Sequence, residues 1–167
     1  DAPGSVQING GLVTTTGNQT YNDTATLGAD TTLNSLLAGN ITFAQTLDDD
    51  GTVATSNLIV NTAGVTTFTG VVGGIAPLTS ITTDFGGLVG DITAINGGAV
   101  TTTGFQLYND NVTLAQDTVL TSTTIGNITI GQPNAPVPWG PTTLSGTVAG
   151  VDLIANALGG NVQINAA

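Results

Sequence analysis

The chain has 167 residues and a formal net charge of −11, because its 11 acidic residues, all Asp, are accompanied by no Lys, Arg or His. Without cations it is not expected to bind nucleic-acid phosphates or anionic membrane surfaces. Without His, Cys or Lys it lacks the usual zinc ligands, the base of a Ser–His or Cys–His pair and the amine of a Schiff base, so we expect no enzyme.

Composition and periodicity predict an all-β protein. The missing Lys, Arg and Met residues are strong helix formers, whereas the abundant Thr, Val and Ile favour strands. Hydrophobic residues make up 40% of the chain, and no apolar run is long enough for a membrane span. Asn34–Leu37 resembles a single helical turn. In chain order, the expected strands are Ser5–Ile8, Leu12–Thr16, Thr24–Leu27, Ile41–Thr46, Leu58–Asn61, Val65–Phe68, Leu78–Thr82, Ile92–Ile95, Val100–Thr103, Val112–Leu114, Val119–Ser122, Ile128–Ile130, Thr142–Leu144, Val151–Ile154 and Val162–Ile164.

An internal repeat organises the chain. Ile8–Gly17 returns as Ile95–Gly104 at an offset of 87 residues, and 23 of the 35 positions from Ile8 to Thr42 are identical in the second copy. Residues 1–91 therefore form a first unit and residues 92–167 a second, shortened unit of one continuous β domain. Weaker echoes within the first unit predict rungs of roughly 17 to 26 residues, about seven in all.

Two architectures fit this repeat. In a β-solenoid, or parallel β-helix, each rung stacks on the next, and Thr, Val and Ile at equivalent positions form ladders. In the alternative, each unit is an immunoglobulin-like β-sandwich, because 87 residues is near the size of such a domain. We favour the solenoid because of the shortened second unit. A solenoid can lose one whole rung without disturbing the others, whereas a deletion of that size would disrupt a closed sandwich.

The run Val13–Asp23, VTTTGNQTYND, followed by Thr26–Leu33, TLGADTTL, resembles the strand repeats of giant bacterial exoproteins. These are the filamentous-haemagglutinin-like and autotransporter-type adhesins. The resemblance covers nearly the whole chain and implies a right-handed parallel β-helix with a surface or adhesive role. Proteins of this type usually run to thousands of residues, so the chain is either a fragment or a small relative.

The beginning and the end of the sequence share one short pattern. Val6-Gln7-Ile8-Asn9 reappears as Val162-Gln163-Ile164-Asn165, and neither end carries a recognisable cap. Bare end rungs expose unpaired backbone groups, and contacts between unlike surfaces of identical copies generate filaments. We therefore expect these eight residues to form a subunit interface.

The acidic residues suggest one weak metal site. Asp48, Asp49 and Asp50 are adjacent, and Ca²⁺ prefers clustered carboxylate oxygens, although the spacing fits no EF-hand loop and a solvated loop is the simpler reading. Ca²⁺ is the sole cofactor that the sequence suggests. Asp23, Asp30, Asp110 and Asp117 recur with the repeat, which favours caps of turns over a catalytic pair.

Aromatic residues and sequons supply the remaining candidates. Trp139, the only Trp, lies among four prolines and either docks a sugar or a neighbouring subunit, or covers a sheet edge. Tyr21 and Tyr108 occupy equivalent repeat positions, which favours packing over binding. Candidate glycosylation sequons begin at Asn18, Asn22, Asn40, Asn111 and Asn127.

Two hypotheses about function follow. In the first, the chain is a structural subunit of an extracellular homopolymeric filament that assembles head to tail, with other copies of itself as its partner. In the alternative, it is a glycan- or surface-binding module of a large secreted adhesin. The absence of Lys, with many Thr and with Asp as the only acid, is typical of exported and cell-surface proteins, so we expect an extracellular location.

Overall fold

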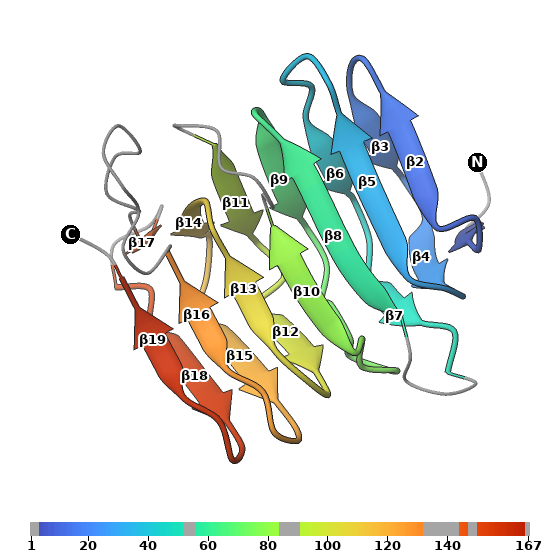
Figure 1. The fold of residues 1–167 in the computed structure, drawn as a ribbon. Coiled ribbons are helices and arrows are strands. Elements are labelled where there is room, and N and C mark those ends of the chain that lie inside the picture. Colours follow the sequence, from blue (N-terminus) through green and yellow to red (C-terminus); the bar gives the residue numbers. More distant parts are fainter. Residues whose placement is uncertain (1–3, 52–55, 84–90, 132–143, 147–149, 166–167) are drawn as a thin grey trace.

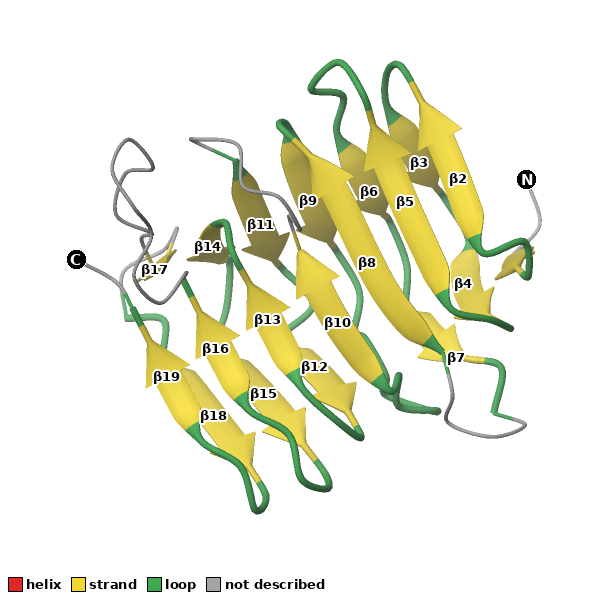
Figure 2. Cartoon of the chain, in the orientation of Figure 1, coloured by secondary structure: helices red, strands yellow, loops and turns green. Residues whose placement is uncertain are grey.

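The chain winds into a β-solenoid (Figure 1). The structure is a computed structural model that describes residues 4–51, 56–83, 91–131, 144–146 and 150–165. These residues form nineteen strands, every strand pairing is parallel, and the described part of the chain contains no helix (Figure 2). The predicted all-β solenoid is confirmed. The alternative of two immunoglobulin-like units is wrong, because such sandwiches pair their strands antiparallel.

The strands form three sides of the solenoid. The first side is a seven-stranded sheet of β2 (Leu12–Thr15), β5 (Thr31–Ser35), β8 (Asn57–Thr62), β10 (Ser80–Thr83), β13 (Gln106–Tyr108), β16 (Ile128–Ile130) and β19 (Val162–Ile164). The second is a six-stranded sheet of β3 (Gln19–Tyr21), β6 (Ile41–Phe43), β9 (Val65–Phe68), β11 (Ile92–Ile95), β14 (Asn111–Leu114) and β17 (Leu144–Gly146).

The third side consists of two three-stranded sheets. They contain β1 (Ser5–Ile8), β4 (Thr24–Leu27) and β7 (Leu47–Asp49), and β12 (Ala99–Thr102), β15 (Thr118–Ser122) and β18 (Leu153–Ala157). Isolated parallel bridges from Leu47 to Val72 and from Val72 to Val100 join the two sheets into one side. The three sides therefore run through both repeat units, and the boundary at residues 91 and 92 interrupts neither of the larger sheets.

A rung is one pass of the chain around the three sides, and the rungs differ in length. Five complete rungs place a strand on every side, slightly fewer than the seven rungs predicted. Two further rungs are incomplete: one has only the bridge residue Val72 on the third side, and the last has β18 and β19 alone among the described strands. Residues paired across neighbouring rungs are 19 apart at Ser5 and Thr24 but 35 apart at Thr118 and Leu153. The upper end of this range exceeds the predicted rung length.

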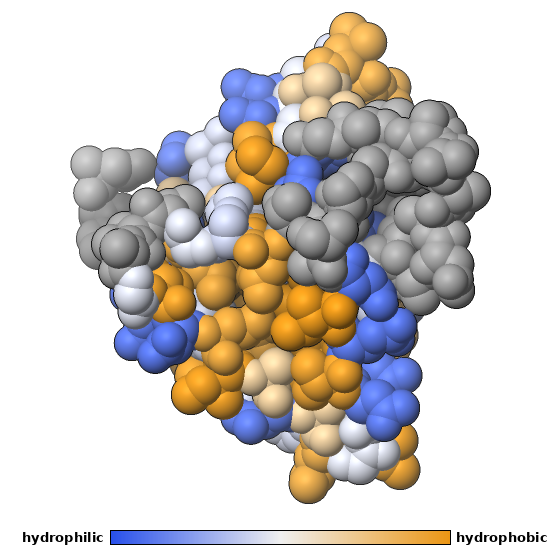
Figure 3. Space-filling view, turned by 90° about the vertical axis from the view of Figure 1, so that its left-hand side faces the viewer, coloured by the Kyte–Doolittle hydropathy of each residue, from blue (hydrophilic) through white to orange (hydrophobic). Residues whose placement is uncertain are grey.

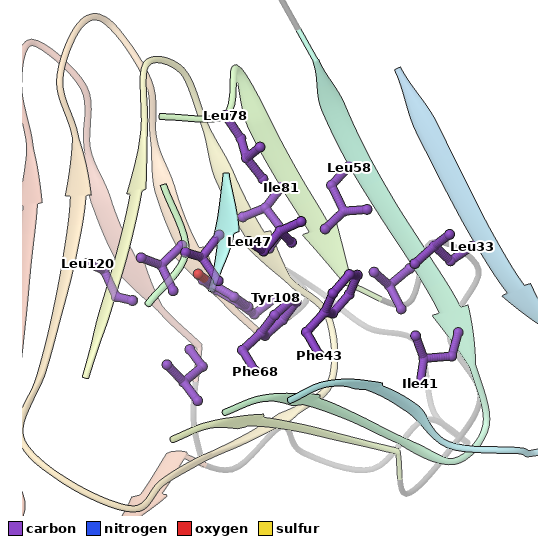
Figure 4. Close-up of a cluster of buried hydrophobic side chains, with 14 of the residues drawn as sticks. Leu33, Ile41, Phe43, Leu47, Leu58, Phe68, Leu78, Ile81, Tyr108 and Leu120 are labelled. Carbon is purple, nitrogen blue, oxygen red and sulfur yellow. The ribbon is translucent and has the colours of Figure 1, made fainter. Parts of the chain in front are cut away.

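Alternating side chains from all three sides fill the interior. Leu58, Ile81 and Leu47 are among the fully buried residues (Figure 4). An aromatic column follows the six-stranded sheet, where Phe43 stacks between Tyr21 and Phe68 with ring centroids 4.9 and 5.6 Å away. A long ladder of apolar side chains from parallel strands is thus the core that stabilises the stack.

Several local predictions need correction. Asn34–Leu37 is not helical, because Asn34 and Ser35 end β5 and a turn follows them. The strand expected at Leu78–Thr82 begins later, at Ser80, and the one expected at Ile41–Thr46 ends at Phe43. Four strands had no counterpart in the prediction: Gln19–Tyr21, Thr31–Ser35, Leu47–Asp49 and Gln106–Tyr108.

The two repeat copies do not lie on the same sides of the solenoid. The first copy begins with β1 on the third side, whereas its counterpart β11 belongs to the six-stranded sheet. The same shift holds for β2 and β12 and for β3 and β13. The offset of 87 residues is therefore three turns and two further sides, so the second copy is rotated by one side relative to the first.

Candidate functional site

The last rung leaves part of the interior open to solvent. In β16, Ile128 and Ile130 point inward and are 0% and 1% exposed. Their partners in β19, Val162 and Ile164, occupy the same inward positions but are 44% and 48% exposed. Apolar residues gather across the middle of this end of the molecule, with polar residues at its left and right margins (Figure 3). Four of the eight predicted interface residues, Val162–Asn165, thus lie on an open, partly apolar end.

The first rung lies at the opposite end of the solenoid. Ile8 is buried and Val6 is half-buried, because both point inward from β1 over Leu27 and Ala25 of the next rung. Gln7 and Asn9 are exposed. Tyr21 begins the aromatic column and is half-buried, and this burial raises the pKa of its hydroxyl.

The structure does not bring the two matching end segments onto the same side. Val6–Ile8 lie in β1 on the third side, whereas Val162–Ile164 lie in β19 of the seven-stranded sheet. A second copy that continued the solenoid would therefore place β2, rather than β1, next to β19. The equivalence of the two segments in sequence does not make them partners in space.

Asp48 and Asp49 are buried in β7, so the expected solvated loop is wrong at these two positions. Asp48 Oδ1 accepts hydrogen bonds from the backbone amides of Ile75 and Ala76, at 2.8 and 3.3 Å. Asp49 accepts from the amides of Gly51 and Ser56, at 3.2 and 3.0 Å. In the described part of the chain, no three acidic side chains converge into a metal-binding group, so the three adjacent Asp residues do not form one.

Three of the four recurring Asp residues link one rung to the next. Asp23 accepts a hydrogen bond from the amide of Gly4 at 3.2 Å, and Asp117 accepts one from the amide of Asp152 at 3.0 Å. Asp30 accepts from both the amide and the side chain of Asn57, each at 2.8 Å. They cap backbone groups as predicted, but the groups belong to the neighbouring rung rather than to their own turn.

Asp110 behaves differently, and sequence reasoning did not identify its neighbour Asp91. Both are buried, at 5% and 2% exposure. Burial, with a smaller contribution from the negative charge of Asp91, raises the pKa of Asp110 to about 7 despite hydrogen bonds from Thr93 and Thr83. No basic side chain exists in the chain to compensate for these two acids.

The two predicted tyrosines pack rather than form a binding surface. Tyr21 stacks on Phe43, and Tyr108 is fully buried, which raises the pKa of its hydroxyl far above the ordinary range. Each hydroxyl donates a hydrogen bond of 3.0 Å to the glutamine two residues earlier, Gln19 or Gln106. Trp139 lies outside the described residues.

The five sequon asparagines lie at or near the corners of the solenoid. Asn18, Asn22, Asn40 and Asn127 are exposed, and Asn111 is half-buried in β14. Asn18, Asn40 and Asn127 each accept a hydrogen bond, of 2.8 to 3.0 Å, from a backbone amide of the following rung. These side chains therefore have a structural role whether or not they carry glycans.

A surface groove across β5, β8 and β10 was not predicted. Its volume is about 540 Å³, and its lining combines the polar residues Asp30, Asn57, Ser80 and Thr82 with Phe105, which is 46% exposed. Such a mixture of hydroxyl, amide and carboxylate groups beside an exposed aromatic ring suits a small polar ligand. The residues lie far apart in sequence, so the groove depends on the register of the rungs.

Comparison with models of known protein families, with curated proteins and with solved structures found no match. Among the described residues there is no helix of the length and apolar character needed to cross a membrane. The features of the structure that bear on function are therefore the open end, the groove and the buried acidic pair.

Proposed function

We propose that this chain is a structural subunit of an extracellular filament in which copies add end to end and continue one solenoid. The observation that carries the proposal is the exposure of Val162 and Ile164. They point inward like their β16 partners in the preceding rung, which are buried. Both side chains are already about half buried, so covering them with a further rung would contribute roughly half of the 1.5–3 kcal/mol that burial of a fully exposed side chain provides. A second copy supplies such a rung.

The three sides of the solenoid determine how two copies would pair. A copy added at the last rung would place β1 on β18 and β2 on β19, because each pair belongs to the same side, while the described part of the last rung has no strand on the six-stranded side. Inward side chains must meet inward side chains. This requirement pairs Val13 and Thr15 of the added copy with Val162 and Ile164, since Val13 and Thr15 lie over buried Leu33 and Ser35.

Such a contact uses different surfaces of the two partners. The last rung of one copy meets the first rung of the next, so the addition does not close on itself and generates a filament. Backbone hydrogen bonds between the end strands would continue the parallel ladders, as strand addition does at other exposed sheet edges. The interface would thus be stabilised by the same interactions that join the rungs within one chain.

Composition and resemblance support the extracellular part of the proposal. The chain lacks every basic side chain, and its strand repeats resemble those of exported bacterial adhesins. The 11 Asp residues make each copy repel the next, so the apolar contact and the ladders must overcome this repulsion.

Electron microscopy and analytical ultracentrifugation of the purified full chain test the proposal. The unmodified chain should form filaments at physiological ionic strength, whereas a double variant with Val162→Asp and Ile164→Asp should remain monomeric. Gln163→Asp controls for added charge, because it puts one Asp into the same strand at an exposed position between the two; the single variants Val162→Asp and Ile164→Asp add the same one charge and are compared with it. The Gln163→Asp variant should still form filaments.

Circular dichroism establishes that each variant is folded. A chain that stays monomeric at every ionic strength would contradict the proposal, and so would filaments of the double variant that equal those of the control.

The groove beside Phe105 supports a second candidate function, the binding of a glycan by a surface module. Carbohydrates pack against exposed aromatic rings and hydrogen-bond to amide, carboxylate and hydroxyl groups such as those of Asn57 and Asp30. A glycan array with the full chain tests this function. Binding that Phe105→Ala abolishes, while Phe105→Tyr retains it, would support the groove, and equal binding by the alanine variant would exclude it.

A further inference from the structure

Asp91 and Asp110 form a buried acidic pair on neighbouring rungs. Each precedes a strand of the six-stranded sheet, and the first residues of these strands, Ile92 and Asn111, are paired in register. Side chains alternate along both strands, and the buried positions continue from Asp91 to Thr93 and from Asp110 to Val112. Both carboxyl groups therefore point toward the interior from equivalent places.

Among the residues that the structure describes, three of the four oxygen atoms of this pair have no hydrogen-bond partner. They are Asp91 Oδ1, Asp91 Oδ2 and Asp110 Oδ1, and each is inaccessible to solvent. The fourth atom, Asp110 Oδ2, accepts a hydrogen bond of 2.5 Å from the hydroxyl of Thr93, which lies 2.9 Å from the hydroxyl of Thr83. A buried carboxylate without partners is strongly unfavourable, so the pair requires compensation.

No side chain of the protein carries a positive charge that could supply that compensation. The sequence contains no Lys, Arg or His, so neither acid can form an ion pair. A water molecule can donate hydrogen bonds to the oxygen atoms, but it cannot neutralise two negative charges. The remaining sources of positive charge are a proton and a metal cation.

We propose that Asp91 and Asp110 bind a Ca²⁺ ion between the two rungs. The polar side chains described at this place offer oxygen: two carboxyl groups and the hydroxyls of Thr93 and Thr83. Ca²⁺ is a hard cation that prefers oxygen ligands and tolerates irregular geometry, whereas zinc and other soft metals favour the nitrogen and sulfur ligands that this chain lacks. The ion would join adjacent rungs of one chain, independently of any filament contact.

The internal repeat supplies a matched control. Asp23 occupies the position equivalent to Asp110, but it is half-buried and accepts a hydrogen bond from the amide of Gly4. The residue equivalent to Asp91 is Gly4 itself, so the first copy has one acid where the second has two. Removing the charge of Asp23 should therefore leave Ca²⁺ binding unchanged.

Isothermal titration calorimetry of the full, chelator-treated chain with CaCl₂ tests the proposal, with MgCl₂ in a parallel titration. We expect the unmodified chain to bind one Ca²⁺. The affinity for Ca²⁺ should be at least tenfold lower in Asp91→Asn and in Asp110→Asn, and unchanged in Asp23→Asn. Thermal unfolding supplies a second readout. A Ca²⁺ concentration one hundred times the dissociation constant should raise the midpoint by roughly 5 to 10 °C in the unmodified chain and in Asp23→Asn.

The asparagine variants also distinguish a cation from a shared proton. Removing one charge should stabilise the chelator-treated protein, so Asp110→Asn is expected to unfold at a higher temperature than the unmodified chain without Ca²⁺. An unmodified chain that binds no Ca²⁺ at neutral pH would overturn the proposal and leave protonation as the compensation. Ca²⁺ binding that persists in both asparagine variants would overturn it too, because the ion would then lie elsewhere.

Discussion

Gln19 and Gln106 make the same set of hydrogen bonds on two different sides of the solenoid. Gln19 Nε2 donates to Asn34 O, Thr15 Oγ1 and Val13 O at 2.8, 3.2 and 3.5 Å. Gln106 Nε2 makes the equivalent contacts with Thr121 O, Thr102 Oγ1 and Val100 O at 2.9, 3.3 and 3.1 Å.

The repeat therefore preserves a local polar network rather than a place on the solenoid. In both copies the glutamine amide satisfies carbonyl groups of its own corner and of the next rung, and its carbonyl accepts the hydroxyl of the following tyrosine. Because Gln106 is fully buried, its network is shielded from water.

Replacing Gln106 should destabilise the protein strongly. Gln106→Ala leaves the hydroxyl of Tyr108 and the carbonyl groups of the corner without their buried partner, which we expect to cost about 2–4 kcal/mol of unfolding free energy. Gln163→Ala, at an exposed position of β19, should cost less than about 0.5 kcal/mol. Urea denaturation followed by circular dichroism measures both. Equal effects would show that the network contributes nothing.

Stacked turns make Gly126 a second sensitive position. A Cβ atom added to Gly126 would lie 2.3 Å from the backbone carbon of Gly104 in the rung before it, whereas one added to Gly17 would meet no atom within 4 Å. We expect Gly126→Ala to lower the unfolding free energy by about 1–3 kcal/mol, because backbone must move to relieve the overlap. Gly17→Ala should be nearly neutral in the same denaturation experiment, and a loss of equal size there would contradict this explanation.

The solenoid could be predicted because short sequence segments show the patterns that it requires. Alternation in segments such as Ile128–Ile130 and the return of Ile8–Gly17 as Ile95–Gly104 both follow from stacking equivalent strands. Leu47–Asp49 was missed because Asp is depleted in strands, and Gln19–Tyr21 was missed because three residues are too few to show a clear alternation. They are held in place by neighbours on adjacent rungs, as the backbone amides that bind Asp48 illustrate.

The candidate sites were harder to predict, because they depend on the register between rungs. Asp91 and Asp110 are 19 residues apart and become neighbours only because Ile92 pairs with Asn111. Rung lengths vary along the chain, so no fixed period in the sequence assigns this pairing. Val162–Asn165 lie at the exposed end, but the strand that a second copy would place against them follows only from the rotation of the repeat by one side.

In the presence of chelator, stability should decrease as the pH rises toward and above neutrality. The pKa of Asp110 is about 7 in the folded chain and 3.8 in its ordinary state, so folding binds a proton between these values. Its contribution to stability is fully present below about pH 4 and is lost as the pH rises through 7, with a total on the order of 4 kcal/mol. Urea denaturation at pH 5 and pH 8 should show this loss in the unmodified chain and a smaller one in Asp110→Asn. A pH dependence that is identical in the two proteins would contradict it.

The aromatic column predicts a large effect of removing its central ring. Phe43 stacks on Tyr21 on one side and on Phe68 on the other, and it is almost completely buried. Phe43→Ala should cost about 3–5 kcal/mol, and Phe43→Leu less, because leucine refills part of the cavity. The exposed Phe105 provides the control, and its alanine variant should lose less than about 1 kcal/mol. Thermal or urea unfolding of the three variants measures the difference.

Assembly of the proposed filament should depend on ionic conditions. Each copy carries a net charge of −11 without a compensating cation, so salt, divalent cations or a pH near 4 should strengthen association by weakening repulsion. Light scattering during a NaCl titration should rise with concentration, and earlier for CaCl₂ than for NaCl at equal ionic strength. Scattering that depends on neither salt nor pH would contradict the role assigned to charge.

The rotation of the second repeat copy by one side determines the direction in which each repeated strand faces the solvent. Strands with nearly the same residues, such as Leu12–Thr15 in β2 and Ala99–Thr102 in β12, look outward in different directions from the same rod. An antibody or receptor that recognised a strand of one copy would have to approach the equivalent strand of the other copy from a different side of the rod. A flat surface in contact with one side of the rod would thus meet each repeated strand once, because the two copies distribute their strands around the circumference instead of aligning them in a row.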